Sequence, residues 1–182
     1  QQLGAPDIYP ALENGTIDAA EWVGPYDDEK LGFNKVAKFY YYPGFWEGGP
    51  MVHAYVNEKK WNELPKHYQA AFETACGDAN QWMMAKYDAQ NPPALRRLVA
   101  SGSQLRAFPR AVLEAAEKAS YEVYDEMSAK SAHFKRIYPE WKKFRDEQFL
   151  WFRVAEQGYD NYSFNSKLGQ PAAAAKPGAK KS

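Results

Sequence analysis

Two short segments of this sequence combine a carboxylate with aromatic side chains beside a glycine turn. In the first, Glu21 and Trp22 precede Gly24-Pro25. In the second, a tyrosine-rich run and Pro43-Gly44 lead to Glu47 and further glycines. Each segment is expected to follow a β-strand, and ligands of open α/β sheets bind beyond the ends of strands. Glu21 and Glu47 are therefore candidates for a shared site.

The two carboxylates leave two kinds of chemistry open. They could act as a general acid and a general base, as in the hydrolysis of a glycosidic bond, or they could bind a ligand without reacting. Against hydrolysis, the sequence holds no serine nucleophile motif, no oxyanion-hole motif and no third catalytic group. A phosphate loop is not indicated either, because Gly48-Gly49-Pro50 is not followed by Lys-Ser or Lys-Thr. Binding is the first hypothesis and an acid/base hydrolase is the alternative.

Histidine and cysteine offer no further site. His53, His67 and His133 share no metal-ligand spacing. The single cysteine, Cys76, lies on the apolar stripe of an expected helix, so we expect it to be buried as a small hydrophobic side chain. A single cysteine forms no intrachain disulfide, so cysteine usage does not indicate the cellular compartment.

The composition disfavours two broad classes of protein. Lysine and arginine number 23, aspartate and glutamate also number 23, and the net charge is zero, whereas nucleic-acid binders carry a basic excess. No apolar run approaches the roughly 18 residues of a transmembrane helix. The hydrophobic fraction of 45% and the aromatic fraction of 16% predict a packed core.

The spacing of apolar residues predicts an α/β fold that is rich in helix and has a few strands. Strands are expected at 16–22, 36–42, 51–56 and 104–108. Helices are expected at 6–13, 29–33, 57–64, 65–91, 94–100, 109–129 and 134–159. Pro92-Pro93 is expected to kink the long helix or to break it before 94–100, and a break at Pro139 is left open.

Large aromatic side chains recur on the expected helices and predict core or interface positions rather than a ligand pocket; they are Trp82, Trp141, Phe144, Trp151 and Phe152. A third hypothesis is therefore a helical interaction module that uses the face between Trp141 and Phe152.

Residues 168–182 are of low complexity and are expected to form a disordered tail. Because Gln1 is followed by no signal peptide, we expect the chain to be part of a longer protein.

The two candidate segments also resemble a known family. The run from Glu13 to Trp22, the tyrosine-rich run to Pro43-Gly44, and Glu47 resemble the periplasmic solute-binding subunits of TRAP transporters, the tripartite ATP-independent periplasmic importers of the DctP type. The similarity is strongest to the branch that binds 2-oxo acids such as pyruvate and related monocarboxylates. It extends through Arg96-Arg97-Leu98 to Trp151-Phe152-Arg153 and covers about residues 3–165.

The resemblance implies an architecture and a role. Residues 1–167 would form the C-terminal portion of a two-lobe α/β binding protein, with about 23–56 contributing to the first lobe and the rest forming the second lobe and the spine helices. Such proteins act in the periplasm, close around an organic anion and deliver it to a membrane permease that a sodium gradient drives. Relatives in this branch can form homodimers through their C-terminal helices.

The resemblance also implies a metal ion beside the substrate. The metal ligands would be Glu21, Trp22 through its backbone carbonyl, and Glu47, and Trp22 and Glu47 would also contact the substrate. Two carboxylates about 4 Å from an anionic ligand would each repel it by roughly 4 kcal/mol at an effective dielectric constant near 20. A hard cation with oxygen ligands reverses that sign. Sodium is the first choice and calcium the alternative.

One feature of the family pattern is absent. The family clamps the substrate carboxylate with an arginine, which suits a planar anion because its guanidinium forms two parallel hydrogen bonds. That arginine lies upstream of the matching segments, and the arginines of this chain fall elsewhere. The 182-residue chain alone is therefore expected to bind an oxo acid weakly or not at all.

Overall fold

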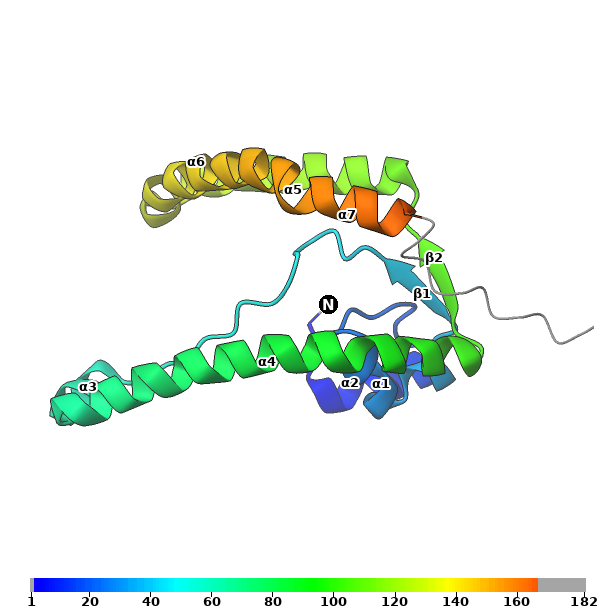
Figure 1. Cartoon of the computed structure of the whole chain (residues 1–182), viewed down its shortest axis with the longest axis horizontal. Coiled ribbons are helices and arrows are strands. Elements are labelled where there is room, and N and C mark those ends of the chain that lie inside the picture. The colour runs from blue at the N-terminus through cyan, green and yellow to red at the C-terminus, as the bar shows by residue number, and fades with distance from the viewer. Residues whose placement is uncertain (1, 167–182) are drawn as a thin grey trace, which may run out of the picture. The chain divides into compact units, whose positions relative to one another are not determined.

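The computed structural model describes residues 2–166 and divides into two compact units, residues 1–117 and 118–182 (Figure 1). The first unit contains α1 (Ala5–Glu13), α2 (Pro25–Leu31), the 3-10 helix η1 (Phe33–Lys35), β1 (Phe39–Tyr42), α3 (Glu58–Glu63), α4 (Lys66–Ala100) and β2 (Gln104–Ala107). Helix α5 (Arg110–Lys130) crosses the division, and α6 (Ala132–Val154) and α7 (Glu156–Asn165) belong to the second unit. The predicted α/β fold with much helix and few strands is confirmed. The predicted tail, residues 168–182, lies outside the described residues.

Local sequence explains where the early helices begin and end. Helix α1 closes as predicted, because Gly15 adopts a φ of 69° that favours glycine. Helix α2 begins at Pro25 rather than at the predicted residue 29, with Gly24 as its N-cap. Asn57 caps α3 at the start of the predicted helix 57–64, and its side chain accepts a hydrogen bond from the Lys60 N–H at 3.2 Å.

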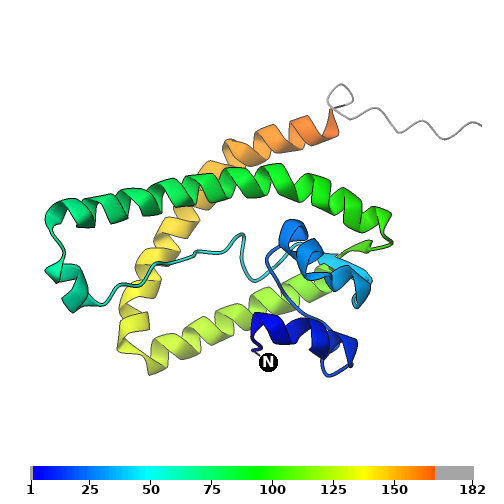
Figure 2. The ribbon, with the colours of Figure 1, turned by 90° about the horizontal axis from the view of Figure 1, so that it is seen from below.

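Of the two outcomes predicted at Pro92-Pro93, a kink or a break, the break is wrong. Helix α4 runs through both prolines to Ala100. Two consecutive prolines remove the N–H donors that would bond the carbonyls of Asp88 and Ala89, but both of these residues are exposed, so water can bond those carbonyls instead. The helix bends in its C-terminal half (Figure 2), as expected where prolines interrupt the hydrogen-bond ladder.

Strands β1 and β2 form a two-stranded parallel sheet, with Phe39 opposite Gln104 and Tyr42 opposite Ala107. They confirm the predicted strands at 36–42 and 104–108, although each observed strand is shorter than predicted. The predicted strands at 16–22 and 51–56 are wrong, because neither segment pairs with another strand in the described part of the chain. At the start of the first, the N–H of Thr16 and that of Ile17 bond back to the Ala11 carbonyl, at 2.8 and 3.3 Å.

The buried hydrophobic core of the described residues is small and belongs to the first unit; it comprises Ile8, Phe33, Ala94 and Leu98. Helix α2 packs against α4. The C-terminal half of α4 supplies Ala94 and Leu98 to the core, and the 3-10 helix that follows α2 supplies Phe33. This packing positions the segments on either side of α2.

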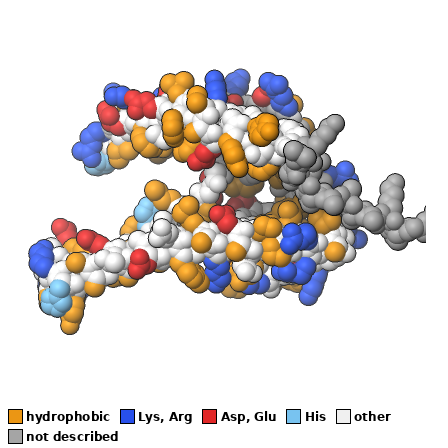
Figure 3. Space-filling model, in the orientation of Figure 1, with side chains coloured by type: hydrophobic (Ala, Val, Ile, Leu, Met, Phe, Trp, Pro, Cys, Tyr) orange, Lys and Arg blue, Asp and Glu red, His pale blue; other side chains and the backbone are white. Residues whose placement is uncertain are grey.

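Much of the remaining apolar surface is exposed, and hydrophobic side chains lie across the visible faces of the helices (Figure 3). Cys76 is exposed, so its predicted burial is wrong; that face of α4 borders an open apolar groove with Val52, Trp61 and Phe72. The helical aromatic side chains named in the sequence analysis are exposed by 40–63%.

Among the described residues, none of the helices is both long and apolar enough to cross a membrane.

The second unit is held by aromatic packing between α5 and α6. The Tyr124 ring lies 5.3 Å from that of Tyr138, which stacks on Trp141 at 5.7 Å. The Arg145 guanidinium donates to the Tyr121 hydroxyl at 2.5 Å. Helix α6 continues through Pro139, and the predicted final helix is interrupted at Ala155 instead.

Replacing Leu98 tests the small core. Leu98 is 2% exposed, so Leu98→Ala should lower the free energy of unfolding by about 2–4 kcal/mol, measured by urea denaturation. Val99 is the next residue on the same helix and is 45% exposed, so Val99→Ala should cost less than about 1 kcal/mol. Equal losses in the two variants would contradict the assignment of the core.

Candidate functional site

Glu21 and Trp22 lie on an irregular segment between α1 and α2. The segment leaves α1 through the turn at Gly15 and ends at Gly24. The side chain of Glu21 is exposed and forms no ion pair or side-chain hydrogen bond with any other described residue. Its carboxylate is therefore free to bind a ligand.

The indole of Trp22 is half-buried and has a defined orientation. It packs edge-to-face against Phe33, with ring centroids 6.4 Å apart and planes at 86°. Phe33 is itself in the buried core. Edge-to-face aromatic pairs of this separation are favourable, so Phe33 holds the indole while part of its surface remains accessible.

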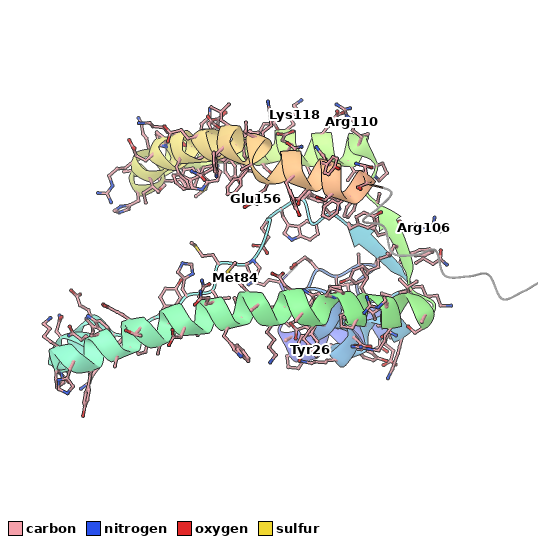
Figure 4. The ribbon with its side chains drawn as sticks, viewed as in Figure 1. Tyr26, Met84, Arg106, Arg110, Lys118 and Glu156 are labelled. Carbon is pink, nitrogen blue, oxygen red and sulfur yellow. The ribbon has the colours of Figure 1, made fainter. Side chains whose placement is uncertain are left out.

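Polar contacts anchor α2, the helix after this segment, on α4. Tyr26, which projects from α2 (Figure 4), donates its N–H to the Asn91 side-chain oxygen at 3.0 Å. The Tyr87 hydroxyl donates to the Asp27 carboxylate at 2.5 Å, and this bond raises the pKa of Tyr87 to about 12.

At the C-terminal end of α2, the Arg97 guanidinium forms a two-pronged pair with Glu29. Both of its N···O distances are 2.7 Å. Parallel paired bonds of this kind fix orientation as well as distance. Together with the bonds to Asn91 and Asp27, they tie α2 to α4 along its length.

Asp28 lies on the same helix and is buried. Its carboxylate accepts a hydrogen bond from the Tyr40 hydroxyl and one from the Gly24 N–H at 3.4 Å. Burial raises the pKa of the Asp28 carboxyl from 3.8 to about 6, the two hydrogen bonds oppose that rise, and the negative charges of Asp27 and Glu21 add to it. Burial, followed by the bond to Asp28, raises the pKa of Tyr40, so its hydroxyl remains a donor.

Glu47 lies on the loop that follows β1. The loop leaves the strand at a cis Tyr42-Pro43 bond. Phe45 packs against Trp46 at 4.6 Å and against Phe108 at 5.3 Å between ring centroids. These contacts hold the first part of the loop beside the end of the two-stranded sheet. The Glu47 side chain is exposed and, like that of Glu21, forms no ion pair with a described residue.

The structure thus brings Glu21 and Trp22 together on one segment and places Glu47 on another. No hydrogen bond, ion pair or ring contact within residues 2–166 joins the Glu47 side chain to the other two. No group of three or more histidine, cysteine, aspartate and glutamate side chains that could hold a metal occurs in this described range. The predicted set contains only two such side chains, Glu21 and Glu47, together with the backbone carbonyl of Trp22. The absence of a larger group from the described residues therefore does not test it, and the metal site stays a prediction.

Sequence reasoning missed Asp28 and Tyr40, which connect the two segments. Asp27 and Asp28 are adjacent aspartates, and nothing in their spacing distinguishes the one that is buried. The alternation of side chains along a strand could have placed Tyr40 on the opposite face from Phe39 and Tyr41. It could not have indicated which partner that face meets.

A family profile and a curated relative both match this sequence. The sequence profile of the bacterial extracellular solute-binding proteins of family 7, DctP, matches residues 1–131. A monocarboxylate 2-oxoacid-binding periplasmic protein from Nostoc sp. is 50% identical over 167 residues, which are 92% of this chain and 46% of that protein. The chain therefore spans about half the length of this curated relative.

Solved structures of TRAP transporter solute-binding proteins are also similar. One from Bordetella bronchiseptica, a mixed-occupancy dimer with calcium and picolinate in its active site, is 56% identical with a TM-score of 0.85, covering 90% of this chain and 49% of that one. One from Colwellia psychrerythraea, with calcium and pyruvate, is 29% identical with a TM-score of 0.79, covering 88% and 49%. One from Pseudoalteromonas atlantica, with sodium and pyruvate, is 29% identical with a TM-score of 0.76 and the same coverage.

The burial of Asp28 predicts how stability depends on pH. The folded pKa of about 6 lies above the ordinary value of 3.8, so between these values the folded chain binds more protons than the unfolded chain. The contribution of this group to stability is complete below the ordinary pKa and is lost as the pH rises through the folded pKa. The free energy of unfolding should fall by about 1–2 kcal/mol over that range, allowing for solvent screening.

Urea denaturation of the wild type and of Asp28→Asn across this pH range measures the effect. Asparagine does not titrate, so the difference in free energy of unfolding between the two proteins should change with pH by the amount given above. A difference that is constant with pH would contradict the raised pKa.

Proposed function

Because the chain belongs to the bacterial extracellular solute-binding proteins of family 7, we propose that it forms part of the periplasmic subunit of a TRAP transporter that captures a 2-oxo acid together with a metal ion. The family membership confirms the predicted resemblance. It also confirms the prediction of a binding protein over the acid/base hydrolase, because the relatives are solute-binding proteins.

The ligands of the relatives carry this proposal. The Nostoc relative is a binding protein for monocarboxylate 2-oxo acids, and the structural relatives hold pyruvate or picolinate with calcium or sodium. Pyruvate has a carbonyl oxygen next to its carboxylate, and picolinate has a ring nitrogen in the same place. Each can therefore chelate one cation through two atoms. A small monocarboxylate with a second donor beside the carboxylate is the substrate class that we assign to this chain.

Glu21, Glu47 and the backbone carbonyl of Trp22 are the proposed metal ligands. Both carboxylates are exposed and free of ion pairs with described residues, so neither must break an existing contact to bind a cation. The donor set consists of oxygen atoms alone, which suits sodium and calcium. Sodium remains the first choice and calcium the alternative. The cation would supply the positive charge that lets an organic anion approach two carboxylates.

Trp22 and Glu47 are the proposed substrate contacts. The indole of Trp22 is held on one side by Phe33 and offers its remaining surface to a small ligand. Glu47 would meet the substrate through the shared cation. The arginine that the family uses for the substrate carboxylate would come from polypeptide beyond these 182 residues.

The wider role follows the family. We place the protein in the periplasm, delivering its ligand to a membrane permease for sodium-driven import. Residues of about 23–56 would contribute to the first lobe, and the remainder of residues 1–167 to the second lobe and spine. The exposed aromatic side chains of α6 support a homodimer through the C-terminal helices, with Trp141 and Trp151 as examples at 46% and 60% exposure.

A chimaera tests the proposed site. The part of the Bordetella relative that this chain does not cover is joined to residues 1–182, and pyruvate binding is measured by calorimetry with sodium or calcium. Pyruvate should bind only when one of these ions is present. Glu47→Gln should weaken binding by about 100-fold or more, because it removes one charged ligand of the ion.

Two controls accompany the chimaera. Glu140→Gln changes an exposed glutamate of α6 and should leave binding unchanged. The 182-residue chain without the added segment should bind pyruvate weakly or not at all. Full binding by Glu47→Gln, or micromolar binding by the unextended chain, would contradict the proposed division of the site.

A further inference from the structure

We propose that Asp28 is a positioning residue that ties the segment carrying Glu21 and Trp22 to β1, the strand that leads to Glu47. The role of those three residues in binding rests on the proposed function, whereas the connection itself rests on contacts within the chain. Asp28 would touch neither the ion nor the substrate. It would set the relative position of the two segments that do.

The first half of the connection joins Asp28 to Gly24, two residues after Trp22. The Asp28 N–H donates to the Gly24 carbonyl at 2.9 Å, and the Gly24 N–H donates to the Asp28 Oδ1 at 3.4 Å. Gly24 has a φ of 157°, and a Cβ there would lie 3.6 Å from the side-chain oxygen of Asn91. Gly24 thus lies beside Asn91 of α4, and hydrogen bonds to Asp28 of α2 hold the end of the segment.

The second half joins Asp28 to the sheet. Its other oxygen, Oδ2, accepts the hydrogen bond from the Tyr40 hydroxyl. Tyr40 is the second residue of β1 and pairs with Leu105 of β2. Side chains alternate along a strand, so Tyr40 faces α2 while Phe39 and Tyr41 face the other way. The strand continues directly into the loop that carries Glu47.

A carboxylate is suited to this place because each of its two oxygens serves a different element. Burying a charged group carries a cost unless it is hydrogen-bonded, and Asp28 is only 7% exposed. Within the described part of the chain, no buried side-chain nitrogen or oxygen lacks a hydrogen-bond partner. The cost of the buried charge is thus offset by bonds to both segments. An asparagine would retain one acceptor oxygen, and an alanine would retain none.

The neighbouring Asp27 provides a matched comparison. It lies on the same helix and also accepts a hydrogen bond from a tyrosine hydroxyl, that of Tyr87. Tyr87 belongs to α4 rather than to the sheet, and the second side-chain contact of Asp27 is a long ion pair with Lys30 at 3.9 Å; its N–H, like that of Asp28, donates to the Gly24 carbonyl. Asp27 therefore helps to hold α2 on α4 but does not connect the two segments.

Hydrogen exchange of the 182-residue chain, read by mass spectrometry, tests the connection directly. Asp28→Ala and Tyr40→Phe should each speed exchange by about tenfold in peptides covering residues 16–24 and 39–47, because each loses hydrogen bonds between these segments. Asp27→Ala and Tyr87→Phe should speed exchange in α2 and α4 and leave the 39–47 peptides unchanged.

The proposal is overturned if Asp28→Ala alters the 39–47 peptides no more than Asp27→Ala does. Should Asp28→Ala fail to fold, Tyr40→Phe decides by the same peptides, since it keeps the ring and removes only the hydroxyl. A global effect on stability would speed exchange equally in all protected peptides, which would also overturn the specific connection.

Pyruvate binding by the chimaera in calcium separates this inference from the proposed function. Asp28→Ala should weaken binding by about tenfold and Asp27→Ala by clearly less, because Asp28 bonds to both segments whereas the Asp27 side chain acts only on the docking of α2 on α4. If Glu47→Gln leaves binding unchanged, the proposed site is wrong, and the exchange result still decides the connection. If Glu47→Gln abolishes binding but Asp28→Ala binds like Asp27→Ala, the positioning role is overturned.

Discussion

The docking of α2 on α4 is the interaction on which the rest of the first unit depends. Asn91, Tyr87 and Arg97 of α4 each hold a different residue of α2. The bond to Asn91 crosses 65 residues of sequence and the pair with Arg97 crosses 68, so these contacts convert a local helix into a fixed element. Both candidate segments take their position from α2, one by direct continuation and the other through Asp28 and Tyr40.

Charge explains why such an arrangement suits a binding protein better than an acid/base enzyme. An organic anion that meets two carboxylates is repelled by both, and a cation between them removes that barrier. In the proposed site, an ion could bridge protein and ligand only if Glu21 and Glu47 stood at a defined separation. That separation depends on the elements that hold the two segments in place rather than on the segments themselves. The buried carboxylate of Asp28 supplies part of that support at the cost of an unfavourable burial.

Sequence reasoning succeeded where the signal is local and failed where it depends on a distant partner. The helix predicted from residue 57 begins at its Asn57 cap, and the tyrosine-rich run predicted β1. The alternation around Ile17 predicted a strand, but a strand also needs a neighbour to pair with, which the segment itself cannot reveal. Pro92 and Pro93 did not end α4, because the carbonyls that they leave unbonded face water. Asp28 could not be told from Asp27, since its burial depends on Tyr40, 12 residues away.

Anomalous diffraction would locate the cation of the proposed site. Crystals of the chimaera would be grown with pyruvate and terbium, a lanthanide that replaces calcium at oxygen-rich sites. We expect a single strong peak within about 2.6 Å of oxygens from Glu21, Glu47 and the Trp22 carbonyl, with the pyruvate carboxylate against it. A peak at other carboxylates, or bound pyruvate with no ion between it and the two glutamates, would contradict it.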